Sequence, residues 1–259
     1  MDFEVVRNDI SIMGTDAIVL PANPFLKEGS GTSKAIYERA GRRALNKACK
    51  EIRIRHKSIR VGTAVPTLGF GLDAKYIIHT VVPRWKGGNF GEYEKLSSAY
   101  LSTLELADLM DCKTIAVPLL ASGNNGFDLD TAIRIAMDSI TAYAPSNKLN
   151  KVYLVTYGMR ATNMIKQLGI EITEFIDQAY VLGKDERFKP LGGRIIDEGA
   201  GIAQKWGDYA LDRAMEFLNN PKNLDLVIEA GKKIVLEQGI DKLVGKAMSD
   251  AIKQFLPKD

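Results

Sequence analysis

The chain has 259 residues, 46% hydrophobic and 26% charged, a composition that excludes disordered, collagen-like and disulfide-scaffold proteins. Its 35 Lys and Arg residues nearly balance its 32 Asp and Glu residues, so net charge indicates neither a nucleic-acid nor a membrane partner. Two cysteines and two histidines, with no CxxC pair, are too few ligands for a zinc cluster, and we expect no metal and no cofactor. The start of the chain has no signal-peptide pattern, and no apolar run approaches the ~20 residues of a membrane span. We therefore expect a cytoplasmic protein.

Up to about residue 180, short β-branched runs alternate with helical patterns, as in βαβ units. Several runs are apolar at consecutive positions, which is typical of strands covered on both faces. The pattern predicts a three-layer α/β/α sandwich around a largely parallel sheet. In chain order, the predicted strands are Phe3–Val6, Ala17–Leu20, Ala64–Thr67, Tyr76–Val81, Thr114–Leu119 and Lys151–Thr156, and the predicted helices are Thr32–Ile52, Glu94–Leu109, Asp128–Ala142 and the shorter Ala161–Leu168.

The pattern changes after Tyr180, where glycines, a proline and mixed charges replace the strand-like runs. We predict a first domain over residues 1–180, a linker over 181–200 and a helical unit over 201–259. Apolar residues recur at helical spacing in this last part, most strictly from Ile240 to Phe255. Such stripes pack against each other, against the first domain or against a protein partner, and burial within the chain is favoured. The mixed charges of the polar faces disfavour a membrane surface.

Two glycine-containing loops follow predicted strands and lead directly into predicted helices. The first begins after Leu20 and contains the turn GSG, and the second follows Leu119 and reads ASGNNGF. Glycine permits a positive φ and close approach of the backbone, and a helix start offers unpaired N–H groups to an anion. One such turn is often only structural, but two on one sheet indicate a pyrophosphate site.

The strongest charge bias lies in residues 39–60, which hold nine Lys or Arg residues and one acidic residue, Glu51. An acidic polymer such as RNA could neutralise its phosphates on this segment. No aromatic residues are interleaved for base stacking, so a solvated helix face is the better interpretation and nucleic-acid binding is disfavoured.

The chain resembles the macrodomain family in seven segments that occur in the family's order and at similar spacing. They are NDI, DAIVLPAN, GSGTSKAIYERAG, GTAVPT, YIIHTVVP, IAVPLLASGNNGF and VYLVTYG, and they cover roughly residues 3–180. The resemblance implies a mixed, mainly parallel sheet between helices and a cleft that binds ADP-ribose. It implies nothing about residues 184–259.

The resemblance also implies roles for single residues. Asp9 would accept a hydrogen bond from the adenine amino group beside the Ile10 backbone, Tyr157 would stack on adenine, and Asn23 would orient the distal ribose. His79 matches a family histidine that is structural. The first loop would hold one phosphate and the distal ribose with Gly29, Ser30, Gly31 and Thr32, and the second would wrap the other phosphate with Ser122, Gly123, Asn124, Asn125, Gly126 and Phe127.

Catalysis is the point at which this chain departs from the hydrolytic branch of the family. There an aspartate ten residues after the asparagine positions or activates water, whereas here Asn23 is followed by Ser33, and the catalytic candidates are these two residues. A serine hydroxyl has no useful basicity near pH 7. Glu28 is the nearest carboxylate that could replace the aspartate, and the substrate's own phosphate could also act as the base. A catalytic role for Lys27 or Lys34 is disfavoured, because both are better explained as solvent-facing residues.

The second loop departs as well, because Asn124 and Asn125 stand where the family commonly has a tyrosine. Three hypotheses follow. The leading one is a module that binds ADP-ribose or ADP-ribosylated proteins. The alternative is an ADP-ribosyl or O-acetyl-ADP-ribose hydrolase that acts without the usual loop aspartate, and the third is an interaction module that uses the helical tail.

Overall fold

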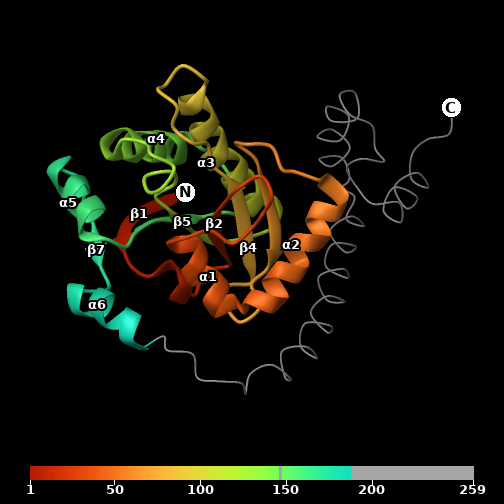
Figure 1. The fold of residues 1–259 in the computed structure, drawn as a ribbon. Helices are drawn as coiled ribbons and strands as arrows, with labels where there is room; N and C mark the ends of the chain where they lie inside the picture. The colour runs from red at the N-terminus through yellow and green to blue at the C-terminus, as the bar shows by residue number, and fades with distance from the viewer. Residues whose placement is uncertain (146–147, 188–259) are drawn as a thin grey trace. The chain divides into compact units, whose positions relative to one another are not determined.

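The computed structural model describes residues 1–145 and 148–187, and the predicted helical unit at 201–259 lies outside the described residues (Figure 1). Strands and helices alternate along most of this length. The strands are β1 (Asp2–Arg7), β2 (Ala17–Ala22), β3 (Ala64–Leu68), β4 (Tyr76–Val81), β5 (Thr114–Pro118), β6 (Lys151–Thr156) and β7 (Thr173–Glu174). The helices are the 3₁₀ turn η1 (Ile10–Ile12) and α1 (Thr32–Ala40), α2 (Arg42–His56), α3 (Glu92–Leu109), α4 (Leu129–Ala142), α5 (Met159–Gln167) and α6 (Gln178–Arg187).

The seven strands form one sheet in the order β3-β4-β2-β5-β6-β1-β7. Every neighbouring pair is parallel except β3 and β4, which are antiparallel. Helices α3, α4 and α5 cover one face, and α1 with the first part of α2 covers the other (Figure 1). The predicted three-layer sandwich with a mixed, mainly parallel sheet is confirmed.

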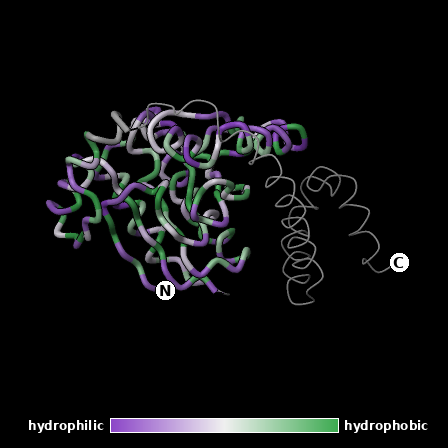
Figure 2. Tube along the Cα trace, turned by 90° about the horizontal axis from the view of Figure 1, so that it is seen from below, coloured by the Kyte–Doolittle hydropathy of each residue, from purple (hydrophilic) through white to green (hydrophobic). Residues whose placement is uncertain are grey.

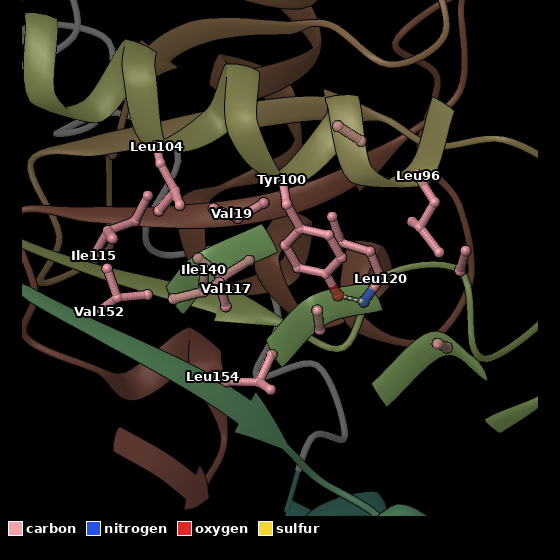
Figure 3. Close-up of a cluster of buried hydrophobic side chains, with 14 of the residues drawn as sticks. Val19, Leu96, Tyr100, Leu104, Ile115, Val117, Leu120, Ile140, Val152 and Leu154 are labelled. Atoms are coloured by element: carbon pink, nitrogen blue, oxygen red, sulfur yellow. Dashed lines mark hydrogen bonds between the residues drawn. The ribbon is translucent and has the colours of Figure 1, made fainter. Parts of the chain in front are cut away.

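The core between the sheet and α3 is built from residues at helical and strand periods. Leu96, Tyr100 and Leu104 repeat every four residues along α3 and are fully buried. They lie over alternate residues of the central strands, which share one face of the sheet because the strand period is two (Figure 3). Those strand residues include Val19, Ile115, Val117, Val152 and Leu154. Figure 2 shows that hydrophobic and hydrophilic stretches alternate along the described chain.

His79 lies at the centre of β4 and is completely buried. One ring nitrogen, Nε2, lies 2.9 Å from the Thr67 hydroxyl, whereas Nδ1 has no hydrogen-bond partner among the described residues. Burial lowers the pKa of this imidazole from 6.5 to about 3. The side chain is thus a neutral core residue.

The helix predicted over 32–52 is instead two helices, because Gly41 interrupts it with a φ of 92°. Glycine in a left-handed conformation commonly ends a helix. The other predicted elements agree with the structure to within two residues at each end. Neither β7 nor α6 was predicted from the pattern, and α6 includes residues 181–187 of the predicted linker.

No helix within the described part of the chain has both the length and the apolar character needed to cross a membrane.

Candidate functional site

The parallel strands β2, β5, β6 and β1 are neighbours, so the segments that follow them meet at the same edge of the sheet. At about 4.8 Å per strand, these four strand ends span roughly 14 Å. After β2 the chain turns through α1 toward β3 and β4, and after β5 it turns through α4 toward β6. The two connections diverge on opposite faces, which makes the β2–β5 boundary a topological switch point, the place where open α/β sheets bind ligands. Both glycine loops begin there.

The first loop, between β2 and α1, is held by its own polar side chains. The Asn23 side chain accepts from the backbone N–H groups of Phe25 and Lys27 and donates to the Lys27 carbonyl at 2.8 Å. Ser33 is buried, and its Oγ accepts from the Gly29 N–H at 2.9 Å. Gly31 precedes α1 with a φ of 57°, a conformation that favours glycine. Asn23 and Ser33 therefore shape the loop in this structure.

The carboxylate nearest the glycine turn, Glu28, is engaged by an arginine. Both Glu28 oxygens accept from Arg42 Nε, at 2.9 and 3.1 Å, and Arg42 also bonds Glu38. The hydrogen bonds that Arg42 donates to Glu38 and Glu28 raise the pKa of Arg42. Lys27 and Lys34 are exposed, as the pattern suggested, and Lys34 lies 3.9 Å from Glu38.

The second loop, between β5 and α4, is a tight turn. Ala121 and Gly126 have positive φ values of 61° and 80°, the Gly126 N–H bonds the Gly123 carbonyl at 2.9 Å, and Ser122 Oγ donates to the Leu119 carbonyl. The turn ends at Asp128, whose side chain accepts from the Thr131 N–H and caps α4.

Tyr100 fixes the start of the second loop from inside the core. Its buried hydroxyl oxygen accepts from the Leu120 N–H at 2.8 Å (Figure 3). Burial raises the pKa of the Tyr100 phenol. A helix on one face of the sheet thereby sets the position at which the loop leaves β5.

The two glycine loops contact each other directly. Asn124 Nδ2 donates to Ser30 Oγ at 2.7 Å, although these residues are 94 positions apart in the chain. Gly123, Asn124 and the glycines 29 and 31 are exposed around this contact, whereas Thr32 and Asn125 are half-buried. The bridge therefore joins the predicted phosphate-binding segments across the switch point.

A third segment, between β4 and α3, supports the second loop. The Trp85 backbone N–H donates to the Asn125 carbonyl at 2.8 Å. The Trp85 ring contacts the buried Phe127 ring edge-on, with 5.1 Å between the ring centroids. Phe127 thus packs in the core behind the loop.

Glu92 organises that segment, and sequence reasoning missed it. Its carboxylate accepts from the N–H groups of Lys86, Gly88 and Phe90. Burial alone would raise the pKa of Glu92, but these N–H donors outweigh it and lower the pKa. No local sequence signal marks the residue, because its donors come from an irregular loop.

The other predicted residues lie at the ends of β1 and β6, which pair in parallel with Arg7 opposite Thr156. Asp9 is almost fully buried and caps η1, with Oδ1 accepting from the Ser11 N–H and hydroxyl at 3.1 and 2.7 Å. Ile10 is buried in η1, which contacts α1 and β5. Tyr157 is half-buried.

Comparisons with known proteins agree with this geometry. The macro domain family model matches residues 19–136. A macro domain-containing protein of Caldanaerobacter subterraneus is 38% identical over 157 residues, or 61% of this chain and 89% of the relative. An O-acetyl-ADP-ribose deacetylase of Enterobacter is 37% identical over 169 residues, or 65% of this chain and 93% of the relative.

The chain belongs to the macro domain family.

Solved macrodomains share the fold. A mutant of the Oceanobacillus iheyensis macrodomain with ADPR is 31% identical, has a TM-score of 0.59 and aligns over 64% of this chain and 92% of its own. The same macrodomain with ADP has a TM-score of 0.61 at 29% identity, over 70% of this chain and 92% of its own. In this macro domain the family match spans both glycine loops, whereas Asp9 and Tyr157 lie outside the matched residues.

Proposed function

We propose that this macro domain binds ADP-ribose, either free or attached to a protein, along the carboxyl edge of its sheet. The observation that carries the proposal is the Asn124–Ser30 hydrogen bond, which joins two glycine loops at the switch point. The backbone there is exposed and lies at the starts of α1 and α4, where unpaired N–H groups favour a diphosphate. The Oceanobacillus macrodomain solved with ADPR supports the choice of ligand.

The order of the strands suggests how the nucleotide lies. Adenine would sit at the ends of β1 and β6, with its amino group donating to Asp9 and its ring on Tyr157. One phosphate would follow at the second loop, over residues 122–127, and the other phosphate and the distal ribose would lie at the first loop, over residues 29–32 beside Asn23. This row of four strand ends is continuous in the sheet.

Isothermal titration of ADP-ribose into the full chain tests the proposal, with AMP as the reference for the adenosine end alone. Asp9→Ala should weaken binding at least tenfold, because it removes the acceptor for the adenine amino group. Asp73→Ala is the matched control: Asp73 is an exposed aspartate in the β3–β4 connection, at the opposite edge of the sheet, and the change should leave affinity unaltered. A wild-type chain that binds no ADP-ribose would refute the proposal.

A second candidate function is hydrolysis of O-acetyl-ADP-ribose to acetate and ADP-ribose, favoured by the relatives named as deacetylases. Ser33 is a poor base, since its Oγ accepts from Gly29. Glu28 could activate water only in competition with Arg42, which bonds both of its oxygens. Release of acetate by wild type but not by Asn23→Ala would support turnover. Loss of acetate release in Glu28→Gln would then identify Glu28 as the base, and unchanged release would indicate the substrate's own phosphate.

We also propose a cytoplasmic location, which is supported by two buried cysteines that form no disulfide. Cell fractionation tests it.

The domain limits stay a proposal as well, with a first domain over residues 1–180, a linker over 181–200 and a helical unit over 201–259. A chain ending at residue 200 should keep ADP-ribose affinity if the helical unit serves a separate protein partner. Loss of folding would show instead that residues 201–259 belong to the first domain.

A further inference from the structure

Helix α6 places a tyrosine against the carboxylate of the candidate adenine site. The Tyr180 hydroxyl lies 3.2 Å from Asp9 Oδ2 and donates to it, although the two residues are 171 positions apart. The other residues of the candidate site lie between Asp9 and Tyr157 in the chain. Tyr180 therefore brings a segment beyond β6 to the end of the site.

Asp9 needs such donors because only 2% of its surface is exposed. A buried carboxylate is stabilised by hydrogen bonds that replace water. Ser11 supplies two donors to Oδ1, and Tyr180 supplies one to Oδ2. The two sets of donors approach different oxygens, so together they fix the orientation of the carboxylate, and each oxygen can accept more than one hydrogen bond.

The start of α6, two residues before Tyr180, is held by a buried arginine of β1. Arg7 donates to the Glu174 carboxylate at 2.9 Å, to Gln178 Oε1 at 3.2 Å and to the Tyr157 carbonyl at 3.4 Å. Its side chain is only 3% exposed. One guanidinium therefore ties the first turn of α6 to the ends of β1 and β6, the two strands that frame the adenine position.

The start of α6 is fixed in the backbone as well. The Phe175 N–H bonds the Arg7 carbonyl at 2.9 Å, and the Tyr180 N–H bonds Asp177 Oδ1 at 2.7 Å. Tyr180, Arg7 and Asp177 line one hollow beside β7, together with residues 174–176. Tyr180 is thus held at its backbone N–H by Asp177 and at its hydroxyl by Asp9.

Building on the proposed function, we propose that Tyr180 is a positioning residue that orients Asp9 as an acceptor and so sets the preference for adenine over hypoxanthine. Adenine presents an amino donor at the position where hypoxanthine presents a carbonyl acceptor. A correctly oriented carboxylate bonds the first and repels the second. Without the Tyr180 hydroxyl, the carboxylate can rotate, and the favourable contact weakens.

The test compares ADP-ribose with inosine diphosphate ribose by calorimetric titration. Tyr180→Phe keeps the ring and removes only the hydroxyl, and it should weaken ADP-ribose binding about five- to tenfold while changing inosine diphosphate ribose binding much less. The ratio of the two affinities should fall accordingly. Ser11→Ala removes the donor hydroxyl at the other oxygen and should shift the ratio in the same direction. Leu182→Ala, an exposed position on the same helix, is the control and should change neither affinity.

The affinity ratio distinguishes positioning from a merely structural role, because general loosening of α6 would weaken both ligands equally. An unchanged ratio in Tyr180→Phe overturns the inference, and so does tighter ADP-ribose binding, which would show that the hydroxyl competes with adenine. A wild type that binds both nucleotides equally also overturns it, while the proposed function stands. A wild type that binds neither nucleotide refutes the proposed function itself.

Discussion

The buried imidazole of His79 should make the protein sensitive to mild acid. The perturbation is a drop from pH 7 to pH 5, compared between wild type and His79→Gln, which keeps a polar group near Thr67 but cannot titrate. In the fold, burial lowers the pKa of His79 to about 3 from its ordinary 6.5. The unfolded chain therefore binds a proton that the folded chain excludes. Stability from this residue is complete above pH 6.5 and declines as the pH falls from 6.5 toward 3.

The size of the effect follows from the difference between the two pKa values. At pH 5 the unfolded imidazole is almost fully protonated and the folded one is not, which amounts to about 2 kcal/mol of lost stability. The environment supports a shift of this kind, since His79 is fully buried and Nδ1 has no partner among the described residues to stabilise a proton.

Urea denaturation followed by far-ultraviolet circular dichroism measures the effect at both pH values. Between pH 7 and pH 5, the free energy of unfolding of wild type should fall by about 2 kcal/mol more than that of His79→Gln. The contributions of the other titratable groups are common to both proteins and cancel in the comparison. If His79→Gln lost as much stability as wild type between the two pH values, the buried imidazole would not be the source of the acid sensitivity.

Three further predictions concern the support of the site. Tyr100→Phe should lower the free energy of unfolding by about 1–3 kcal/mol in urea denaturation, because the buried Leu120 N–H loses its acceptor. Ser30→Ala and Asn124→Ala should each weaken ADP-ribose binding, because each removes the same hydrogen bond. The double variant should therefore bind no more weakly than the weaker single variant, and additive losses of affinity in calorimetry would contradict this shared role. Arg7→Met should raise amide exchange in α6, measured by mass spectrometry, since it deletes the bonds to Glu174 and Gln178; unchanged exchange would show that α6 is anchored elsewhere.

Much of the fold could be predicted from hydrophobic period alone. The central strands are apolar at consecutive positions because both of their faces are covered, and this pattern located six of the seven strands in the described part of the chain. The seventh, β7, has only two residues, both exposed, and carries no periodic signal. Gly41 was visible in the sequence, but only its φ of 92° shows that it ends one helix and separates it from the next.

The site was harder to predict than the fold. The sequence indicated both glycine loops, because turn chemistry is local and glycine is rare in the middle of regular elements. It could not show that Asn23 and Ser33 form hydrogen bonds within the first loop, or that Glu28 is paired with Arg42. Those bonds depend on loop conformation, which single residues do not determine.

By itself the sequence determined the family, the layered architecture and the two loops that suit a diphosphate, since each follows from patterns a few residues long. Only the tertiary structure decided which distant groups meet: Asn124 with Ser30, Tyr100 with the Leu120 N–H, and Tyr180 with Asp9. The physical reason is that sheet order brings separate strand ends to one edge. Hydrogen bonds between groups 20 to 171 residues apart then leave no pattern along the chain.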